Sequence, residues 1–180
     1  MPNSDWFTHA QIFDDLLIVA NCSTAAFVLK TTDGLILIDA IYPKEDMYNA
    51  IVSAIEDTGW NPADIKKFVI THGHFDHIMS LDTLRNATNI PAYIHEYDNE
   101  LLGDGEKNAF KTFFGKDRAF APADRLLRDK DKLALGNSEL EIMLTPGHTK
   151  GSVCIITPDF LVTGDTLFAN SYGRCDLYGG

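Results

Sequence analysis

The sequence predicts one layered α/β domain in which the helices lie between two strand-rich regions. Three observations predict it: short apolar runs with turn signals in the first third, helical periodicity in the middle, and short apolar runs again at the end. Strands and helices grouped in this way indicate a sandwich of two or four layers and not a doubly wound sheet. The 180 residues suffice for one substantial domain, 1–180, and are too few for two.

The first third is expected to form three strands, at residues 15–20, 25–30 and 35–40. Between the last two, Thr32–Gly34 reads TDG, which predicts a hairpin turn. Pro43 is then expected to open an amphipathic helix that ends at Gly59, because apolar residues recur at helical spacing. These apolar residues are Met47, Ala50, Ile51, Ala54 and Ile55.

The rest of the chain alternates between the two element types. A short buried strand, 66–71, precedes a helix from about His77 to Asn86, and a strand follows at 90–95. Residues 96–120 have a weak helical pattern that three glycines interrupt. The last third returns to strands, expected at 125–129, 140–144, 152–157 and 160–164.

Composition and charge argue against several classes of function. Lys and Arg number 15 against 26 Asp and Glu, a formal charge of −11, so the chain lacks the basic footprint that nucleic acids and anionic membranes attract. No run approaches transmembrane length, and the apolar run at 16–20 is too short for a signal-peptide core. Cys22, Cys154 and Cys175 have unrelated spacings, which predicts reduced, buried thiols in a cytoplasmic protein.

Residues 71–77 read THGHFDH and hold three of the six histidines, directly after an apolar run. A buried imidazole needs a polar partner, so this cluster predicts a metal site. An extended backbone would point His72 and His74 to one side, as two ligands of one ion. Asp76 and His77 lie where the chain turns into the next helix and can face a second point. Imidazole with carboxylate favours zinc or another first-row divalent ion over calcium or magnesium.

Two later motifs supply further candidates. TPGHTKGS, 145–152, places His148 at the tip of a turn that Pro146 and Gly147 force. VTGDTLF, 162–168, projects Asp165 from the end of an apolar strand. Either residue alone is more typical of an ordinary turn, but beside the histidine cluster His148 is favoured as a ligand.

In this order, THGHFDH, TPGHTKGS and TGDTLF resemble the motifs of the metallo-β-lactamase superfamily of metallohydrolases. LILIDA, 35–40, is similar to that family's early strand ending in an aspartate, here Asp39, which would support the metal ligands from behind. The likeness covers about residues 15 to 180. It implies an αββα four-layer sandwich with two metals at one edge between its two β-sheets.

Carried over by motif, the resemblance implies that one metal is held by His72, His74 and His148, that Asp76 and His77 hold the second, and that Asp165 bridges both. Zinc is the expected metal at both sites, with iron or manganese as alternatives. The family usually takes one more histidine from a later segment, and none follows His148. We read His95 as a rim or core histidine and not as a substitute.

Relatives in the family usually continue beyond CDLYGG through another strand and a helix. We therefore expect either that the chain is shortened at its carboxyl end or that its second metal is incompletely held. A sheet edge left uncovered invites pairing with another chain, so a homodimer is expected as well.

The resemblance also implies a mechanism, in which a hydroxide held between two metals and oriented by Asp76 attacks an acyl carbonyl. GDTLF around Asp165, and the segment SYGRCDLYGG, are similar to glyoxalase-II-like thioesterases, including hydroxyacylglutathione hydrolases. This favours a thioester as the small-molecule substrate. Tyr172 and Arg174 are expected to line the mouth of the site, where arginine would meet an anionic group.

Other functions stay open, because kinship of fold alone does not fix a substrate. The segment DTGWNPADIKKFVITHGHFDHIMSL is also similar to the lactamase branch, so a β-lactam or lactone hydrolase is one alternative. A persulfide dioxygenase with a single iron shares the same signatures and is another. Flavodiiron-type oxygen reductases typically have Glu where this chain has His74, which counts against that class. A non-catalytic fragment is the last alternative.

Overall fold

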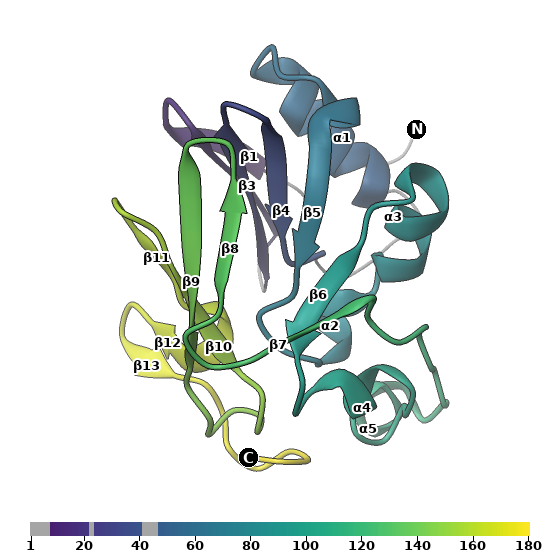
Figure 1. Cartoon of the computed structure of the whole chain (residues 1–180). Helices are drawn as coiled ribbons and strands as arrows, with labels where there is room; N and C mark the ends of the chain where they lie inside the picture. Colours follow the sequence, from purple (N-terminus) through teal and green to yellow (C-terminus); the bar gives the residue numbers. More distant parts are fainter. Residues whose placement is uncertain (1–7, 22–23, 41–46) are drawn as a thin grey trace.

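The computed structural model of the chain describes residues 8–21, 24–40 and 47–180. The expected helix start at Pro43, and Cys22, lie outside these residues. Within these ranges, thirteen strands and five α-helices are arranged as stacked layers (Figure 1). Among the described residues, no helix is long and apolar enough to cross a membrane.

The larger sheet has seven strands in chain order, antiparallel from β1 to β4 and parallel from β4 to β7. Its strands are β1 (Thr8–Phe13), β2 (Leu16–Ala20), β3 (Ala25–Thr31), β4 (Gly34–Ile38), β5 (Ile65–Val69), β6 (Ala92–His95) and β7 (Arg125–Leu127).

The smaller sheet has four antiparallel strands in the order β11-β10-β9-β8. They are β8 (Lys132–Leu135), β9 (Ser138–Leu144), β10 (Val153–Ile156) and β11 (Leu161–Val162). A separate two-stranded hairpin follows, made of β12 (Leu167–Phe168) and β13 (Ser171–Tyr172).

The helices are short, apart from the first. They are α1 (Met47–Asp57), α2 (Phe75–Ile78), α3 (Leu81–Thr88), α4 (Asn99–Leu102) and α5 (Phe110–Phe114), with 3-10 turns η2 (Pro62–Asp64) and η3 (Gly164–Thr166).

Strand alternation explains the layers. In β4, Leu35 and Leu37 pack with α1 and α3 in one buried cluster, whereas Ile36 and Ile38 pack with β9 and β10 in a second cluster. Successive side chains of a strand point to opposite faces, so β4 is buried on both, and each such side chain contributes about 1.5–3 kcal/mol by leaving water. The described residues thus build the helix–sheet–sheet part of the four-layer sandwich, which confirms the predicted α/β architecture.

The helix expected from about His77 to Asn86 differs from the observed structure. It begins earlier, as α2, breaks at Met79 and Ser80, and resumes as α3. The carbonyl oxygen of His77 accepts a hydrogen bond from the backbone N–H of Ala40, at 2.9 Å. That carbonyl would serve Leu81 in a continuous helix, so the break ties α2 to the end of β4.

Two other expectations need correction. Residues 96–120 form only the short helices α4 and α5, joined by turns. The sequence does not predict strands β1 and β8. Every residue of β1 is exposed, and β8 alternates only between exposed and half-buried positions. Neither strand therefore offers a strong apolar signal.

The layers bring several loops to one end of the molecule. β4, β5 and β6 run in parallel toward the same end, where α2 lies (Figure 1, bottom). The loop from β9 to β10 and the hairpin β12–β13 lie at that end of the smaller sheet (Figure 1). Segments from both halves of the sequence therefore meet there.

Candidate metal centre

The six candidate ligands come from four segments that this end of the fold brings together. His72 and His74 follow β5, Asp76 and His77 lie in α2, His148 is in the loop between β9 and β10, and Asp165 is in η3. Two groups of metal-ligand type lie within 4.8 Å, atom to atom, and share His72: one is His72, His74 and His148, the other His72, Asp76 and His77.

The first group, which we call the triad, consists of His72, His74 and His148. All three side chains are buried. Nε2 of His148 lies 3.1 Å from Nε2 of His72 and 2.9 Å from Nδ1 of His74. Donor atoms on a tetrahedral zinc with bonds of 2.0–2.1 Å are about 3.3 Å apart, so the spacing of the triad is close to what one ion requires.

Hydrogen bonds behind the triad orient two of its rings. The hydroxyl of Thr71 donates to Oδ2 of Asp39 at 2.7 Å and can therefore accept from Nδ1 of His72, 3.2 Å away. Nδ1 of His148 donates to the carbonyl oxygen of Arg174 at 2.8 Å. A neutral imidazole carries one proton, so the Nε2 atoms of His72 and His148 face each other with lone pairs. A cation between them would relieve that repulsion, and the site therefore fits a metal.

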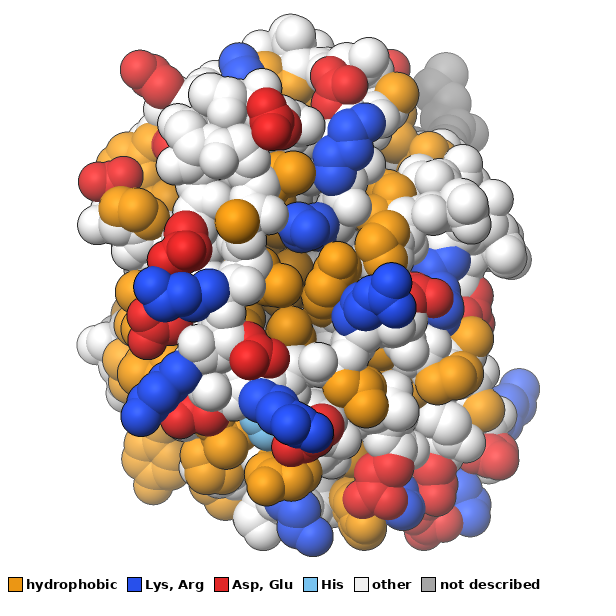
Figure 2. Space-filling model, viewed as in Figure 1, with side chains coloured by type: hydrophobic (Ala, Val, Ile, Leu, Met, Phe, Trp, Pro, Cys, Tyr) orange, Lys and Arg blue, Asp and Glu red, His pale blue; other side chains and the backbone are white. Residues whose placement is uncertain are grey.

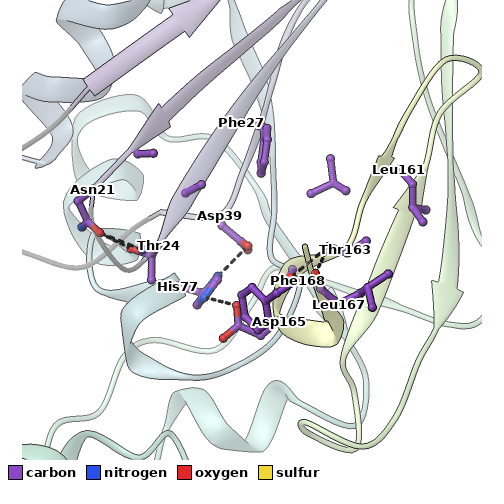
Figure 3. Close-up of a pocket in the computed structure, with 14 residues that line it drawn as sticks. Asn21, Thr24, Phe27, Asp39, His77, Leu161, Thr163, Asp165, Leu167 and Phe168 are labelled. Atoms are coloured by element: carbon purple, nitrogen blue, oxygen red, sulfur yellow. Dashed lines mark hydrogen bonds and ion pairs between the residues drawn. The ribbon is translucent and has the colours of Figure 1, made fainter. Parts of the chain in front are cut away.

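The mixed group, as we call it, consists of Asp76 and His77 from the second of these groups together with Asp165, which lies beside His77. Asp165 Oδ1 lies 3.2 Å from Nε2 of His77, and its Oδ2 lies 3.6 Å from Nε2 of His148. Asp165 therefore also lies close to the triad, and Figure 3 shows the ring of His77 between Asp165 and Asp39. Among the residues that the structure describes, Nε2 of His77 and Nε2 of His74 have no hydrogen-bond partner, and Asp165 approaches His77 as an ion pair.

Asp39 anchors the centre from behind. It follows β4 with a backbone φ of +58° and is 2% exposed. Its carboxylate accepts from the backbone N–H of Thr71 at 2.7 Å and from Nδ1 of His77 at 2.8 Å. Asp39 thus contacts a candidate ligand directly and, through Thr71, reaches a second one. Its effect on metal binding stays a prediction.

One glycine allows the segment carrying Asp165 to come close. Gly164 has a φ of +48°, and a Cβ atom there would lie 2.6 Å from Oγ1 of Thr71. A larger residue would push η3 away from the loop after β5. The glycine before Asp165 therefore matters for the site as well as for the turn.

Electrostatics keeps two rings of the triad, His72 and His74, in the form that binds metal. Burial lowers the pKa of His72 well below its ordinary value, and burial followed by the charge of His148 lowers the pKa of His74 to about 3. Both rings are therefore neutral near pH 7, as metal ligands must be.

The mixed group behaves differently. Burial acts to lower the pKa of His77, but the carboxylates of Asp39 and Asp165 outweigh it and raise that pKa well above its ordinary value. Burial raises the pKa of Asp76. Burial acts to raise the pKa of Asp165 also, but its contact with His77 and the charges of the nearby histidines lower it overall. Without an ion, the mixed group thus sets a protonated His77 against the carboxylates of Asp39 and Asp165.

Two cavities flank the donors. The inter-sheet pocket, of about 360 Å³, has Asp39, His77 and Asp165 on its wall, and Asn21, Thr24 and Phe27 lie in its lining too (Figure 3). The aromatic pocket, of about 310 Å³, lies on the other side. Its lining is His74, Phe75, Asp76, Ala109, Phe113, Phe114, His148, Asp165, Arg174 and Leu177.

The two residues expected at the mouth differ. Arg174 lines the aromatic pocket, and its guanidinium pairs with both carboxylate oxygens of Asp176, at 2.7 and 2.8 Å. Tyr172 is 77% exposed and lines neither pocket. It pairs with Leu167 in the β12–β13 hairpin, where both side chains are exposed, and its place at the mouth stays a prediction.

Sequence reasoning also missed or misjudged residues around the centre. Thr71 opens the THGHFDH motif without being a candidate ligand, Asp98 lies outside the motifs, and the aromatic residues of α5 have a weak helical pattern. His95 is buried and belongs to neither ligand group, as expected of a core histidine. Cys154 is buried in β10, but Cys175 is exposed, so the expectation of a buried thiol was wrong there, because the chain after β13 runs over the surface.

The sandwich and the histidine-rich centre define a class of metal-binding α/β proteins, and comparison with known proteins identifies the family. The sequence signature of the Metallo-beta-lactamase superfamily matches residues 19–180. The chain belongs to this superfamily.

Individual relatives agree with this assignment. The chain is 38% identical over 128 residues to a Bacillus subtilis protein named "Probable metallo-hydrolase YqgX", a match that covers 70% of this chain and 59% of that protein. The chain thus spans little more than half the length of this relative.

Two solved structures show the same fold. The B3 metallo-beta-lactamase BLEG-1 is 32% identical, with a TM-score of 0.75 over 87% of this chain and 74% of that one. The class B3 di-zinc metallo-beta-lactamase LRA-12, from an Alaskan soil metagenome, is 26% identical, with a TM-score of 0.73 over 89% of this chain and 63% of that one.

Proposed function

We propose that the chain is a metal-dependent hydrolase of acyl substrates, and that thioesters of the glyoxalase-II type are its favoured substrates. The observation that carries this is the convergence of buried donor atoms at the base of an open pocket. The triad would hold one zinc, Asp76 and His77 a second, and Asp165 would contact both. Iron or manganese are the alternative ions, because the mixed group supplies carboxylates.

A divalent ion at this place would lower the pKa of a bound water toward roughly 7 and would act as a Lewis acid. The protein's own groups do the rest. The carboxylate of Asp76 faces the aromatic pocket from α2, so it can orient the attacking water and accept its proton. Asp39 keeps the ring of His77 directed at the centre through the hydrogen bond at Nδ1.

The lining of the aromatic pocket indicates which part of a substrate would lie there. Phe75 packs on Phe113 and Phe114, with ring centroids 5.4 and 5.5 Å apart. Phe113 and Phe114 are 52% and 41% exposed. Such a wall favours an apolar acyl or aryl group.

Arg174 is the cation of the aromatic pocket, and its guanidinium lies 5.9 Å from the ring centroid of Phe113. Asp176 already engages this guanidinium. We therefore expect a substrate with at most one anionic group near Arg174.

A β-lactam or lactone hydrolase is the second candidate, and the fold of the two lactamase structures favours it. Asp165 distinguishes the two candidates. In lactamases of this superfamily the matching position is usually not a bridging aspartate, whereas glyoxalase-II-like thioesterases keep it. The contacts of Asp165 with His77 and His148 therefore support the thioesterase reading.

The test is a substrate panel on protein of measured metal content. The zinc-loaded chain is assayed with a 2-hydroxyacyl glutathione thioester, aliphatic and aryl acyl thioesters, a chromogenic β-lactam and an N-acyl lactone. Oxygen uptake by the iron-loaded chain with glutathione persulfide tests the dioxygenase alternative. We expect thioesters to be cleaved fastest. Faster β-lactam or lactone cleavage, or oxygen uptake without hydrolysis, would overturn the thioesterase assignment.

Asp76→Asn provides the matched variant. Loss of a group that handles the proton lowers turnover by about 100- to 10,000-fold, while much of the bound metal is retained. Asp82→Asn, at a half-buried position of α3 outside both donor groups, is the control and should keep normal turnover. An active Asp76→Asn protein would remove Asp76 from the mechanism.

We also propose that the substrate is a small molecule and not a nucleic acid. The chain carries a net charge of −11, and basic and acidic side chains are interspersed on the face in Figure 2. A filter-binding assay with single-stranded and duplex DNA tests this, with no retention at low salt expected.

A further inference from the structure

The carboxylate of Asp98 is a fully buried charge that belongs to none of the motifs. It lies in the turn after β6 and is 0% exposed. Burial raises the pKa of its carboxyl group, against hydrogen bonds that lower it. Burying a carboxylate costs free energy unless it is well hydrogen-bonded. The hydrogen-bond partners of Asp98 therefore indicate its role.

Asp98 joins the two loops that carry the triad. Its Oδ2 accepts from the backbone N–H of Gly73 at 2.8 Å and from Oγ1 of Thr149 at 2.6 Å, and its Oδ1 accepts from the backbone N–H of Gly151 at 2.7 Å. Gly73 stands between His72 and His74, and Thr149 directly follows His148. One carboxylate therefore touches the neighbours of all three candidate ligands.

Glycine is required where the loops meet this carboxylate. A Cβ atom at Gly151 would lie 2.7 Å from the backbone nitrogen and from Oδ1 of Asp98. A Cβ atom at Gly73 would lie 2.7 Å from Cβ of Leu101 and 3.1 Å from the carbonyl oxygen of Asp98. Both loops are thus packed against the turn after β6 by close backbone approach, in addition to the hydrogen bonds.

A second tie holds only the base of the two loops. The backbone N–H of Val153 donates to the carbonyl oxygen of Thr71 at 2.9 Å, where the strands end. Beyond that point His74 and His148 are carried on loop backbone. The hydrogen bonds to Asp98 are made by residues next to these histidines, so they can set the distance between the imidazole rings of His74 and His148.

We infer that Asp98 is a positioning residue that fixes the separation of the two histidine loops and so pre-forms the triad for its metal. This inference rests on the proposed metal-dependent function. Groups that orient metal ligands typically change metal affinity or activity by about 10–100-fold when they are replaced. The effect differs from a general loss of stability, because it acts on the metal affinity of protein that is still folded.

The experiment measures zinc affinity of the metal-free, folded chain by competition with a chromogenic chelator, well below the midpoint of thermal unfolding. Asp98→Asn keeps the size of the side chain but offers one acceptor oxygen in place of two. We expect its zinc affinity to fall by about 10–100-fold. The visible spectrum of the cobalt-substituted protein should change too, because it reports the arrangement of ligands around the ion.

Asp124→Asn is the matched control. Asp124 also accepts a backbone N–H, that of Ala92 at 2.8 Å, and pairs with Arg85 at 2.8 Å, but it acts at the opposite end of β6. Its replacement should lower thermal stability without moving zinc affinity or the cobalt spectrum. Thr149→Val removes a single hydrogen bond to Asp98 and serves if Asp98→Asn does not fold, with an affinity loss of about 5-fold expected.

The outcomes distinguish a failure of the proposed function from a failure of the positioning role of Asp98. If the unmodified chain binds no zinc or cobalt, the proposed function fails and this inference falls with it. If the unmodified chain binds metal but the Asp98 and Thr149 variants bind it with unchanged affinity and an unchanged cobalt spectrum, the proposed function stands and the positioning role is wrong. Reduced affinity in both variants, with Asp124→Asn unaffected, supports the role.

Discussion

The two donor groups of the centre differ in kind although they share one end of the fold. The triad offers three buried imidazoles, and Nε2 of His148 lies 2.9 Å from a ring nitrogen of His74 and 3.1 Å from one of His72. The mixed group offers one imidazole and two carboxylates, and the side chain of Asp165 is 22% exposed. Buried neutral imidazoles suit zinc, whereas carboxylate ligands also accept harder ions. The comparison suggests one firmly held ion and one that exchanges.

The largest effect is expected from a substitution that removes a member of the triad. His148→Ala removes the nitrogen that lies close to both other rings, and should abolish binding of the first ion and activity together, a loss greater than the roughly 100-fold that supporting groups cause. Plasma emission spectroscopy and turnover measure it, and His74→Ala should behave alike. His95→Ala, which removes a buried histidine outside both groups, is the control. Full metal content in His148→Ala would contradict the ligand assignment.

The next effect separates the two groups. Asp165→Asn weakens the charge that faces His77 and should release the second ion while the triad keeps its own. Stepwise removal of metal with a chelator should then show one tight equivalent where the unmodified chain shows a tight and a weaker one. Two ions that leave together in the unmodified chain, with equal affinity, would show that the groups do not differ as we propose.

A smaller effect is expected at Asp39, which hydrogen-bonds the candidate ligand His77. Asp39→Asn keeps the shape of the side chain but weakens its hold on His77 and Thr71, and should lower metal affinity by about 10–100-fold without unfolding the protein. Isothermal titration with zinc, beside circular dichroism of the metal-free variant, measures both quantities. An unchanged affinity would return Asp39 to the role of an ordinary residue at a strand end.

The smallest effect concerns a single hydroxyl. Thr71→Val removes the group that lies between Asp39 and His72 and should weaken the triad ion by about 5-fold, the value of roughly one hydrogen bond of 1 kcal/mol. Thr71→Ser restores the hydroxyl and should restore the affinity. If valine and serine variants bind zinc equally, the orientation of His72 depends on packing alone.

The residues of the centre also show which parts of the site could be predicted from the sequence. Every candidate ligand lies in a compact motif at a strand end, so its residue type and position could be read locally, and the sandwich followed from apolar runs. Asp98 could not be found in this way, because its partners Gly73 and Gly151 are far from it along the chain and nothing local marks it. The direction of the Tyr172 side chain could not be read from the sequence either, since a two-residue strand leaves no pattern to show which way a side chain points.

The arrangement of the donors has a consequence for folding. His72 and His74 follow a strand of the seven-stranded sheet, whereas His148 follows a strand of the four-stranded one. The triad ion would therefore connect the two sheets across a long stretch of chain. It would act as a removable cross-link, comparable to a disulfide in closing a large loop of the unfolded chain. At free zinc one hundred times the dissociation constant, such a ligand adds about 2.7 kcal/mol to the free energy of unfolding. The supply of metal would then govern how long each molecule survives proteolysis, as well as whether it turns over substrate.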